Sequence, residues 1–225
     1  MQESNYHGFT YCMSDIHGEY DRYISMLEYI NFSSEDRLFI IGDAIDRHPN
    51  GVDILMDIMK RPNVYFVAGN HEEMLLNTLG PKSVFGARQL WQSNGGSPTR
   101  RELLYHRTRE ELQEILKFVA SLPDHLDIEV DGRAFHLVHG MPSKFHDERL
   151  WDRPTADTCD PIPGVTVIVG HTPTLYLNGD DLLDNKPFRI WHGKGIIDID
   201  CGCGNQTNLR RLACLRLDDM SEFYI

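Results

Sequence analysis

Apolar runs of four or five residues recur along the first third of the chain, and a helical pattern follows each one. The first run covers residues 9–13, the second 38–41 and the third 63–67. Helix-favouring stretches at 52–59 and 72–79 follow the second and third runs. Short apolar runs that alternate with helical patterns are typical of buried parallel strands in an α/β sheet. The pattern therefore predicts three strand–loop–helix units.

The middle of the chain is expected to form a helical cap. Residues 84–121 turn helical, most clearly where apolar side chains recur at helical spacing, at Leu112, Ile115, Leu116 and Val119. We expect this segment to lie over one side of a functional site and to contribute to substrate choice.

The second half of the chain predicts further strands. Residues 126–130 and 134–138 flank an Asp-Gly turn, which is a strong hairpin signal, and 165–169 form another apolar run. The tail, at 196–200 and 207–217, alternates apolar and polar residues. Such alternation predicts a second, mainly antiparallel sheet.

The composition is that of an ordinary globular domain. Of the 225 residues, 41% are hydrophobic and 25% charged, and no Gly/Ser-rich or Pro-rich linker interrupts them, so one domain over residues 1–225 is expected. No apolar stretch approaches the roughly 20 residues of a membrane-spanning helix. The N-terminal residues lack the basic start and apolar run of a secretion signal. We therefore expect a cytoplasmic protein without membrane contacts.

The net charge and the cysteines exclude two further classes of protein. A net charge of -12 leaves no basic face to displace counterions, so nucleic acid is not an expected partner. Five scattered cysteines do not resemble a disulfide framework. Cys201 and Cys203 lack a second cysteine pair that would complete a zinc site, so a turn is the preferred interpretation there.

Five short segments place acids, His or Asn beside glycine or at the end of an expected strand. They are residues 14–18, 42–47, 69–72, 138–140 and 170–172. A single such segment is most often a solvated turn. Five in succession, with carboxylate and imidazole donors, indicate a metal centre at the edge of the sheet where strand ends and helix starts converge.

Six residues of these segments are candidate metal ligands: Asp15, His17, Asp43, Asn70, His139 and His171. Asp15 and His17 can reach one ion, Asp43 can bridge to a second ion, and the other three residues would complete it. Two divalent cations about 3.5 to 4 Å apart can activate a shared water and stabilise an in-line displacement at phosphorus. The absence of a thiolate from the set favours manganese or iron, with zinc as a further alternative.

Four more residues are candidates for catalysis. Asp46 is well placed to orient His71 and keep it protonated, which would make His71 the general acid. Arg47 and Arg153 are candidates for binding the phosphoryl group, because a planar guanidinium holds such oxygens through two parallel hydrogen bonds.

These motifs resemble the PPP family of metal-dependent serine/threonine phosphatases, in particular its small bacterial and bacteriophage members. The family patterns GDxHG, GDxxDRG and GNHE and two later histidines fall on the residues named above, and the resemblance covers nearly the whole chain. It implies the same ligands and acid pair, and a calcineurin-like α/β (α+β) fold with a central β-sandwich of mixed sheets flanked by helices. Ser14 and His48 stand where the family usually has Gly, a departure that removes no ligand and bears on substrate choice rather than on catalysis.

The leading hypothesis is therefore a phosphoprotein phosphatase that hydrolyses phosphate monoesters of Ser or Thr, with Tyr or His as alternatives. Direct attack by a hydroxide held between two metal ions would require no phosphoenzyme. One alternative is symmetrical hydrolysis of dinucleoside polyphosphates such as diadenosine tetraphosphate, an activity of relatives whose chains are usually longer. Another is a metal-bound regulatory module without turnover, which the retention of Asp46, Arg47 and His71 disfavours.

Overall fold

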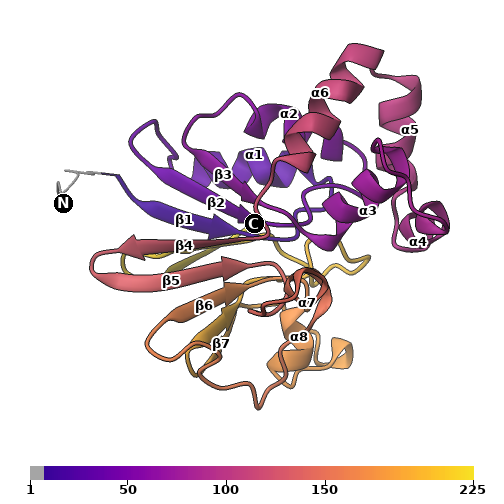
Figure 1. Ribbon diagram of the computed structural model, residues 1–225. Coiled ribbons are helices and arrows are strands. Elements are labelled where there is room, and N and C mark those ends of the chain that lie inside the picture. Colours follow the sequence, from indigo (N-terminus) through magenta and orange to yellow (C-terminus); the bar gives the residue numbers. More distant parts are fainter. Residues whose placement is uncertain (1–7) are drawn as a thin grey trace.

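The computed structural model describes residues 8–225, which form two β-sheets stacked face to face with helices outside them (Figure 1). The first sheet contains, in spatial order, β10 (Ser221–Tyr224), β9 (Ala213–Arg216), β1 (Thr10–Met13), β2 (Arg37–Ile41) and β3 (Val64–Val67). The second contains β4 (His125–Val130), β5 (Arg133–Val138), β6 (Thr166–Val169), β8 (Ile196–Asp198) and β7 (Trp191–Gly193). The expected sandwich of mixed sheets is confirmed, whereas the N-terminal residues considered as a secretion signal, 1–7, lie outside the described residues.

The three expected strand–loop–helix units are present. Each of β1, β2 and β3 is followed by a helix, namely α1 (Tyr20–Tyr29), α2 (Gly51–Ile58) and α3 (Asn70–Leu79). β2 pairs in parallel with both β1 and β3, so the connecting helices must cross over the sheet. Tyr23 and Leu55 of these helices belong to the same buried core as Tyr11 and Ile40 of the strands.

Alternate residues of β1 and β2 face opposite layers of the molecule. Tyr11 and Ile40 lie in the core beneath the helices, whereas Cys12 and Phe39 lie in the core between the two sheets. Successive side chains of a strand point to opposite faces, so these strands are buried on both sides. This burial accounts for their unbroken apolar runs in the sequence.

The tail of the chain differs from the expected arrangement. The alternation at 196–200 and 207–217 predicts a second, mainly antiparallel sheet, and this prediction is wrong. β8 lies parallel to β6 in the second sheet, and β6 is also parallel to β5, whereas β9 returns to the first sheet beside β1. Cys214 of β9 faces the helix-side core and Leu215 faces the sandwich interior. The tail therefore alternates between two buried layers rather than between core and solvent.

Residues 84–121 contain three helices, α4 (Ala87–Ser93), α5 (Ser97–Tyr105) and α6 (Arg109–Ala120). α6 begins with a capping box in which Thr108 and Glu111 each bond the other's backbone N–H. Trp91 and Leu103 join the core beneath the helices. The segment contacts α2 and α3, and in Figure 1 it lies beyond α3 on the side of the first sheet.

Three short helices lie beside the second sheet, α7 (His146–Trp151), α8 (Thr174–Leu177) and the 3-10 helix η1 (Leu182–Asp184). Leu177 of α8 packs with Val167 and Val169 of β6 and so covers part of the sheet's outer face. Among residues 8–225, no helix combines the length and the apolar character needed to cross a membrane.

The assignment of β9 to the interior can be tested with a matched pair of leucines. Leu215 is fully buried between the sheets, so Leu215→Ala should lower the free energy of unfolding by about 2 to 5 kcal/mol. Leu183 is 91% exposed on η1, and Leu183→Ala should change it by less than about 0.5 kcal/mol. Urea unfolding followed by circular dichroism measures both values. Similar small losses in the two variants would contradict the assignment.

Candidate metal centre

All five polar segments meet at one end of the sandwich, where β1, β2, β3, β5 and β6 end. Backbone hydrogen bonds join neighbouring segments: the N–H of Asp15 donates to the carbonyl of Gly42 at 3.2 Å, and the N–H of Gly170 donates to that of His139 at 3.0 Å. The N–H of His171 donates to Oδ2 of Asp15 at 2.9 Å and so links the first segment to the last. Residues as far apart in sequence as Asp15 and His171 thus share one pocket.

Two groups of donor atoms occupy this pocket. The first consists of His17, Asp43 and His71, and the second consists of Asp43, His139 and His171. Within each group, the donor atoms lie within 4.8 Å of one another, and all the residues are buried. Asp43 belongs to both groups. Each group has the composition and spacing that a cation requires.

The two remaining candidate ligands lie beside these groups. Oδ1 of Asp15 is 3.7 Å from Nε2 of His17, and Oδ1 of Asn70 is 3.0 Å from Nε2 of His139. The structure thus brings all six candidate ligands together. It also places His71, the candidate acid, among the first group of donors.

The backbone orients two of the imidazole rings. Nδ1 of His17 donates to the carbonyl of Ile45 and Nδ1 of His139 donates to that of Ile41, both at 2.9 Å. A carbonyl oxygen can only accept, so each Nδ1 carries a proton, and in the neutral ring that binds a cation the lone pair is on Nε2. Those Nε2 atoms lie 3.6 and 3.3 Å from Oδ2 of Asp43. Both rings therefore present their ligating nitrogen to the shared carboxylate.

Three buried polar atoms indicate that the pocket fits divalent cations. Within residues 8–225, Nε2 of His17, Oδ2 of Asp43 and Nε2 of His171 have no hydrogen-bond partner. A buried polar group without a partner costs about 1 to 3 kcal/mol, which coordination to a cation would offset. Carboxylate, imidazole and amide donors without a thiolate suit manganese or iron, and zinc is also compatible with them.

Burial and the charge of Asp43 set the electrostatics of the pocket. Burial raises the pKa of Asp43, but the neighbouring His139 and His71 outweigh it and hold that pKa well below its usual value. Burial lowers the pKa of His139, yet the Asp43 carboxylate raises it to about 10. Burial, assisted by His139, lowers the pKa of His171 to about 3. His171 is therefore a neutral imidazole, the form that binds metals.

The loops hold much of the site in a left-handed backbone conformation. Positive φ angles of 50 to 75° occur at Asp15, His17, Asp43, Asp46, Arg47 and His171. Such a conformation costs a residue with a Cβ about 1 kcal/mol or more, so the surrounding packing must impose it. Gly170, in contrast, must lack a side chain, because a Cβ there would overlap Oγ of Ser14. The departure at Ser14 is thus accommodated by the glycine that faces it.

Glu72 has a role that the sequence motif did not reveal. Its carboxylate accepts hydrogen bonds from the N–H groups of Asp43 at 2.8 Å, Ala44 at 3.0 Å and Gly69 at 3.0 Å. These bonds join the loop after β2 to the start of α3. The sequence signal for this role was the position of Glu72, since an acid in the first turn of a helix readily reaches back to free N–H groups.

The candidate acid pair is held by residues from two helices. Nδ1 of His71 lies 2.6 Å from Oδ2 of Asp46, and Nε1 of Trp91 donates to the same oxygen at 2.6 Å. The N–H of Asp46 donates to Oγ1 of Thr99 at 2.9 Å. Trp91 and Thr99 belong to α4 and α5, and no sequence pattern connects them with Asp46. The helical segment thus helps to hold the pair.

The two candidate arginines line one cavity beside the second donor group. This cavity of about 630 Å³ also includes His171, Tyr176 and Asn205 in its lining. Nη1 of Arg153 donates to the carbonyl of His171 at 2.6 Å, which holds the arginine beside the donors. Both arginines therefore border a space large enough for a phosphorylated side chain.

His48, the second departure from the family pattern, is held away from that cavity. Its Nδ1 lies 3.1 Å from Oε1 of Glu19, and its Nε2 lies 3.1 Å from Nη1 of Arg210. The ring thus lies between Glu19 and Arg210 and does not line that cavity.

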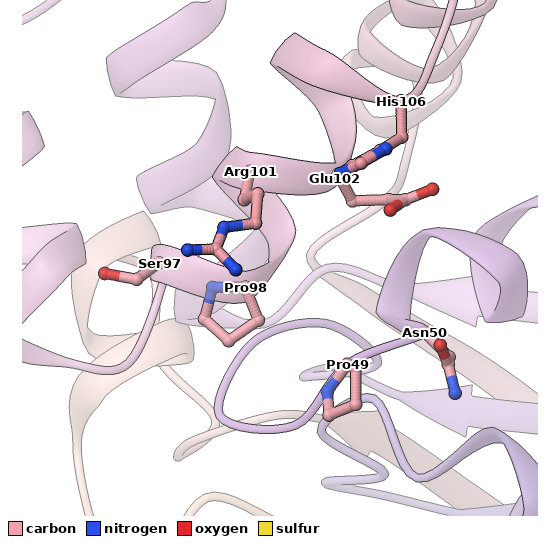
Figure 2. Close-up of a pocket in the computed structure, with 7 residues that line it drawn as sticks. All are labelled: Pro49, Asn50, Ser97, Pro98, Arg101, Glu102 and His106. Atoms are coloured by element: carbon pink, nitrogen blue, oxygen red, sulfur yellow. The ribbon is translucent and has the colours of Figure 1, made fainter.

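A separate hollow of about 420 Å³ lies between the turn that follows Arg47 and α5. Figure 2 shows Pro49 and Asn50 on one side of it and Arg101 and His106 on the other. None of the donor residues lines this hollow, which places it outside the candidate metal centre.

The family profile of the calcineurin-like phosphoesterases matches residues 10–197 of the chain. The chain is 31% identical to Serine/threonine-protein phosphatase 2 of Escherichia coli (strain K12) over 145 residues, or 61% of this chain and 62% of that protein. It is 44% identical over 68 residues to the symmetrical bis(5'-nucleosyl)-tetraphosphatase of Wigglesworthia glossinidia brevipalpis, or 29% of this chain and 25% of that protein. The matches thus span less than two thirds of either relative.

A solved structure agrees with the sequence comparisons. A crystal structure described as a candidate diadenosine tetraphosphatase superposes with a TM-score of 0.66 at 17% identity, and the match covers 98% of this chain and 94% of that one. At that identity the similarity shows a shared fold.

The role of Asp43 can be tested through binding of manganese. Adding Mn²⁺ at about 100 times its dissociation constant to chelator-treated protein should raise the melting temperature by roughly 5 to 10 °C. Asp43→Asn keeps the shape but removes the shared charge, so it should abolish most of this shift. Asp127→Asn, on the exposed face of β4, should retain it. An unchanged shift in the Asp43 variant would contradict the shared-ligand assignment.

Proposed function

The chain belongs to the calcineurin-like phosphoesterase family, and on that premise we propose that it is a metal-dependent phosphoprotein phosphatase acting on phosphate monoesters. The observation that carries the proposal is the Asp46–His71 pair, which adjoins Asp43, the residue that both donor groups share, and places His71 in the first of them. The match to a bacterial serine/threonine phosphatase over 61% of the chain supports this substrate class. We further propose that the 1–225 chain acts as one cytoplasmic domain, with a phosphorylated protein rather than nucleic acid as its partner.

The chain's own residues can bind and orient a phosphate monoester. Arg47 and Arg153 line the same cavity as His171, so both can approach one phosphoryl group. Their forked donors match phosphoryl oxygens and would bind more strongly as negative charge develops in the transition state. Divalent cations held by the six candidate ligands would supply activation of the attacking water and neutralise charge on the phosphoryl oxygens.

His71 can supply the proton that the leaving oxygen requires. Asp46 accepts a hydrogen bond from Nδ1–H of His71, so the Nε2 proton of the ring remains for transfer toward the pocket. Trp91 holds the same carboxylate oxygen and thereby fixes the direction of the pair. We propose that residues 84–121 act as a cap and that this cap keeps the acid pair in position.

A second candidate function is symmetrical hydrolysis of dinucleoside polyphosphates. It is favoured by the 44% identity to a bis(5'-nucleosyl)-tetraphosphatase over 68 residues. The hollow in Figure 2 offers Arg101 and His106 beside the turn that follows Arg47, where a distal nucleotide could bind. The third hypothesis, a regulatory module without turnover, uses the same metal site but no acid pair.

Replacing His71 separates its roles as acid and as ligand. His71→Asn should reduce kcat by roughly 10²- to 10⁴-fold with metal content unchanged, because the general acid alone is lost. His192→Asn, at an exposed histidine outside the site, is the matched control and should leave both quantities unchanged. Metal analysis by mass spectrometry and hydrolysis of p-nitrophenyl phosphate give the two readouts. Loss of metal in the His71 variant would make this residue a ligand.

A substrate panel on manganese-loaded protein tests the proposed function itself. Phosphoserine, phosphothreonine and phosphotyrosine peptides are compared with diadenosine tetraphosphate and p-nitrophenyl phosphate. We expect the best phosphopeptide to exceed diadenosine tetraphosphate in kcat/KM by about tenfold or more, which corresponds to roughly 1.4 kcal/mol of transition-state binding. The reverse order would establish the second candidate function. No turnover of any compound would favour the regulatory module.

A further inference from the structure

A groove beside the candidate metal centre carries an inference that deepens the proposed function and rests on it. The groove has a volume of about 530 Å³ and lies between α3, the residues around the start of α4, and α7. In Figure 1 α7 lies below α3 and α4 on the same side of the molecule. Glu73 and Met74 line one wall, and Asp147 and Trp151 line the opposite one.

Large apolar side chains on the rim of the groove are open to solvent. Phe85 is fully exposed at 105%, Val84 is 54% exposed and Leu90 is 47% exposed. All three line the groove. Neighbouring exposed apolar side chains next to a functional site typically mark a surface that another molecule covers. An aromatic side chain that needs no rearrangement to make contact is a suitable anchor for a partner.

The charges of the groove all have one sign. Its lining includes the four acids Glu73, Asp147, Glu148 and Asp152, and no Lys, Arg or His. Glu73 is engaged, since Oε2 accepts from Nε1 of Trp151 at 3.1 Å and Oε1 lies 3.3 Å from Nε2 of His146. Within residues 8–225, the exposed Asp147 and Asp152 form no ion pair. The groove therefore complements a cation and repels a polyphosphate.

The groove adjoins the candidate catalytic site through Trp151. The Trp151 ring lies edge-to-face with that of His171, with the ring centroids 6.1 Å apart. Its indole N–H donates to Glu73, two residues beyond His71 in α3. Asp152 directly precedes Arg153, which lines the cavity that the two candidate arginines share. A chain segment whose phosphoryl group lies between the two arginines can therefore continue into the groove.

From these observations we infer that the groove binds the polypeptide flanking the phosphorylated residue and selects segments that carry a basic and an apolar side chain. An apolar side chain of the substrate covers Phe85, and a lysine or arginine pairs with Asp147. The charge pattern distinguishes this occupant from a dinucleoside polyphosphate, whose tail the four acids would repel.

The test uses the full chain loaded with manganese and pairs of phosphopeptides that differ only in their flanks. One member of each pair has Leu and Lys within three residues of the phosphorylated position, and the other has Leu and Glu, with the flank placed on either side in separate pairs. We expect the Lys peptide to be preferred in kcat/KM by roughly fivefold to tenfold, mainly through KM. p-Nitrophenyl phosphate, which does not reach the groove, is the internal reference.

Two variants test whether residues of the groove cause the preference between the peptides. Asp147→Lys should abolish the preference for the Lys peptide, and Phe85→Ser should raise KM for both peptides by about tenfold. Both should leave p-nitrophenyl phosphate hydrolysis unchanged. The matched controls are Glu129→Lys, on the exposed face of β4, and Leu183→Ser, at an exposed leucine on η1; neither should alter peptide kinetics.

The possible outcomes distinguish failure of the groove assignment from failure of the proposed function. Hydrolysis of phosphopeptides without a flank preference, or a preference that both variants retain, overturns the groove assignment alone. Hydrolysis of p-nitrophenyl phosphate or diadenosine tetraphosphate without that of any phosphopeptide overturns the phosphoprotein proposal, and the groove assignment with it. A wild-type dimer that Phe85→Ser converts to monomer on size-exclusion chromatography would show that a second copy of the chain covers the groove, which also overturns the inference.

Discussion

The mutual approach of the loops after β2 and β3 depends on one buried carboxylate. Glu72 accepts hydrogen bonds from three backbone N–H groups, those of Asp43, Ala44 and Gly69. Each N–H group left buried without an acceptor would cost about 1 to 3 kcal/mol. The location of Asp43, which both donor groups share, thus follows from a residue that belongs to neither group. The close approach also requires Gly69, where a Cβ would overlap Asp43 itself.

Much of the fold and of the candidate site could be predicted because their signals are local. Each of β1, β2 and β3 is a short apolar run, buried throughout in β1 and at every position but Tyr65 in β3, and the polar cluster follows within a few residues. Parallel pairing then carries the ends of these strands to the same edge, so residues such as Asp15 and Asp43 meet without any long-range signal. The hairpin of β4 and β5 was equally local, since its Asp-Gly turn lies between two apolar runs.

Features that depend on distant contacts could not be predicted. Trp91 and Thr99 bond to Asp46 across 45 and 53 residues, and no spacing rule connects these positions. β9 was assigned to the wrong sheet because its alternation between two buried layers looks the same in sequence as alternation between core and solvent. The sequence also did not reveal that His71, which bonds to Asp46, belongs to the first group of donors as well.

The left-handed backbone at Asp15, Asp43 and His171 has a consequence for how this centre should be dissected by mutagenesis. Alanine tolerates that region poorly, whereas asparagine enters it more readily than most residues. An alanine scan of the loops would therefore combine the loss of a side chain with a change in backbone preference and would exaggerate the importance of every position. Asparagine substitutions keep the loop geometry and report the chemistry of the removed group alone.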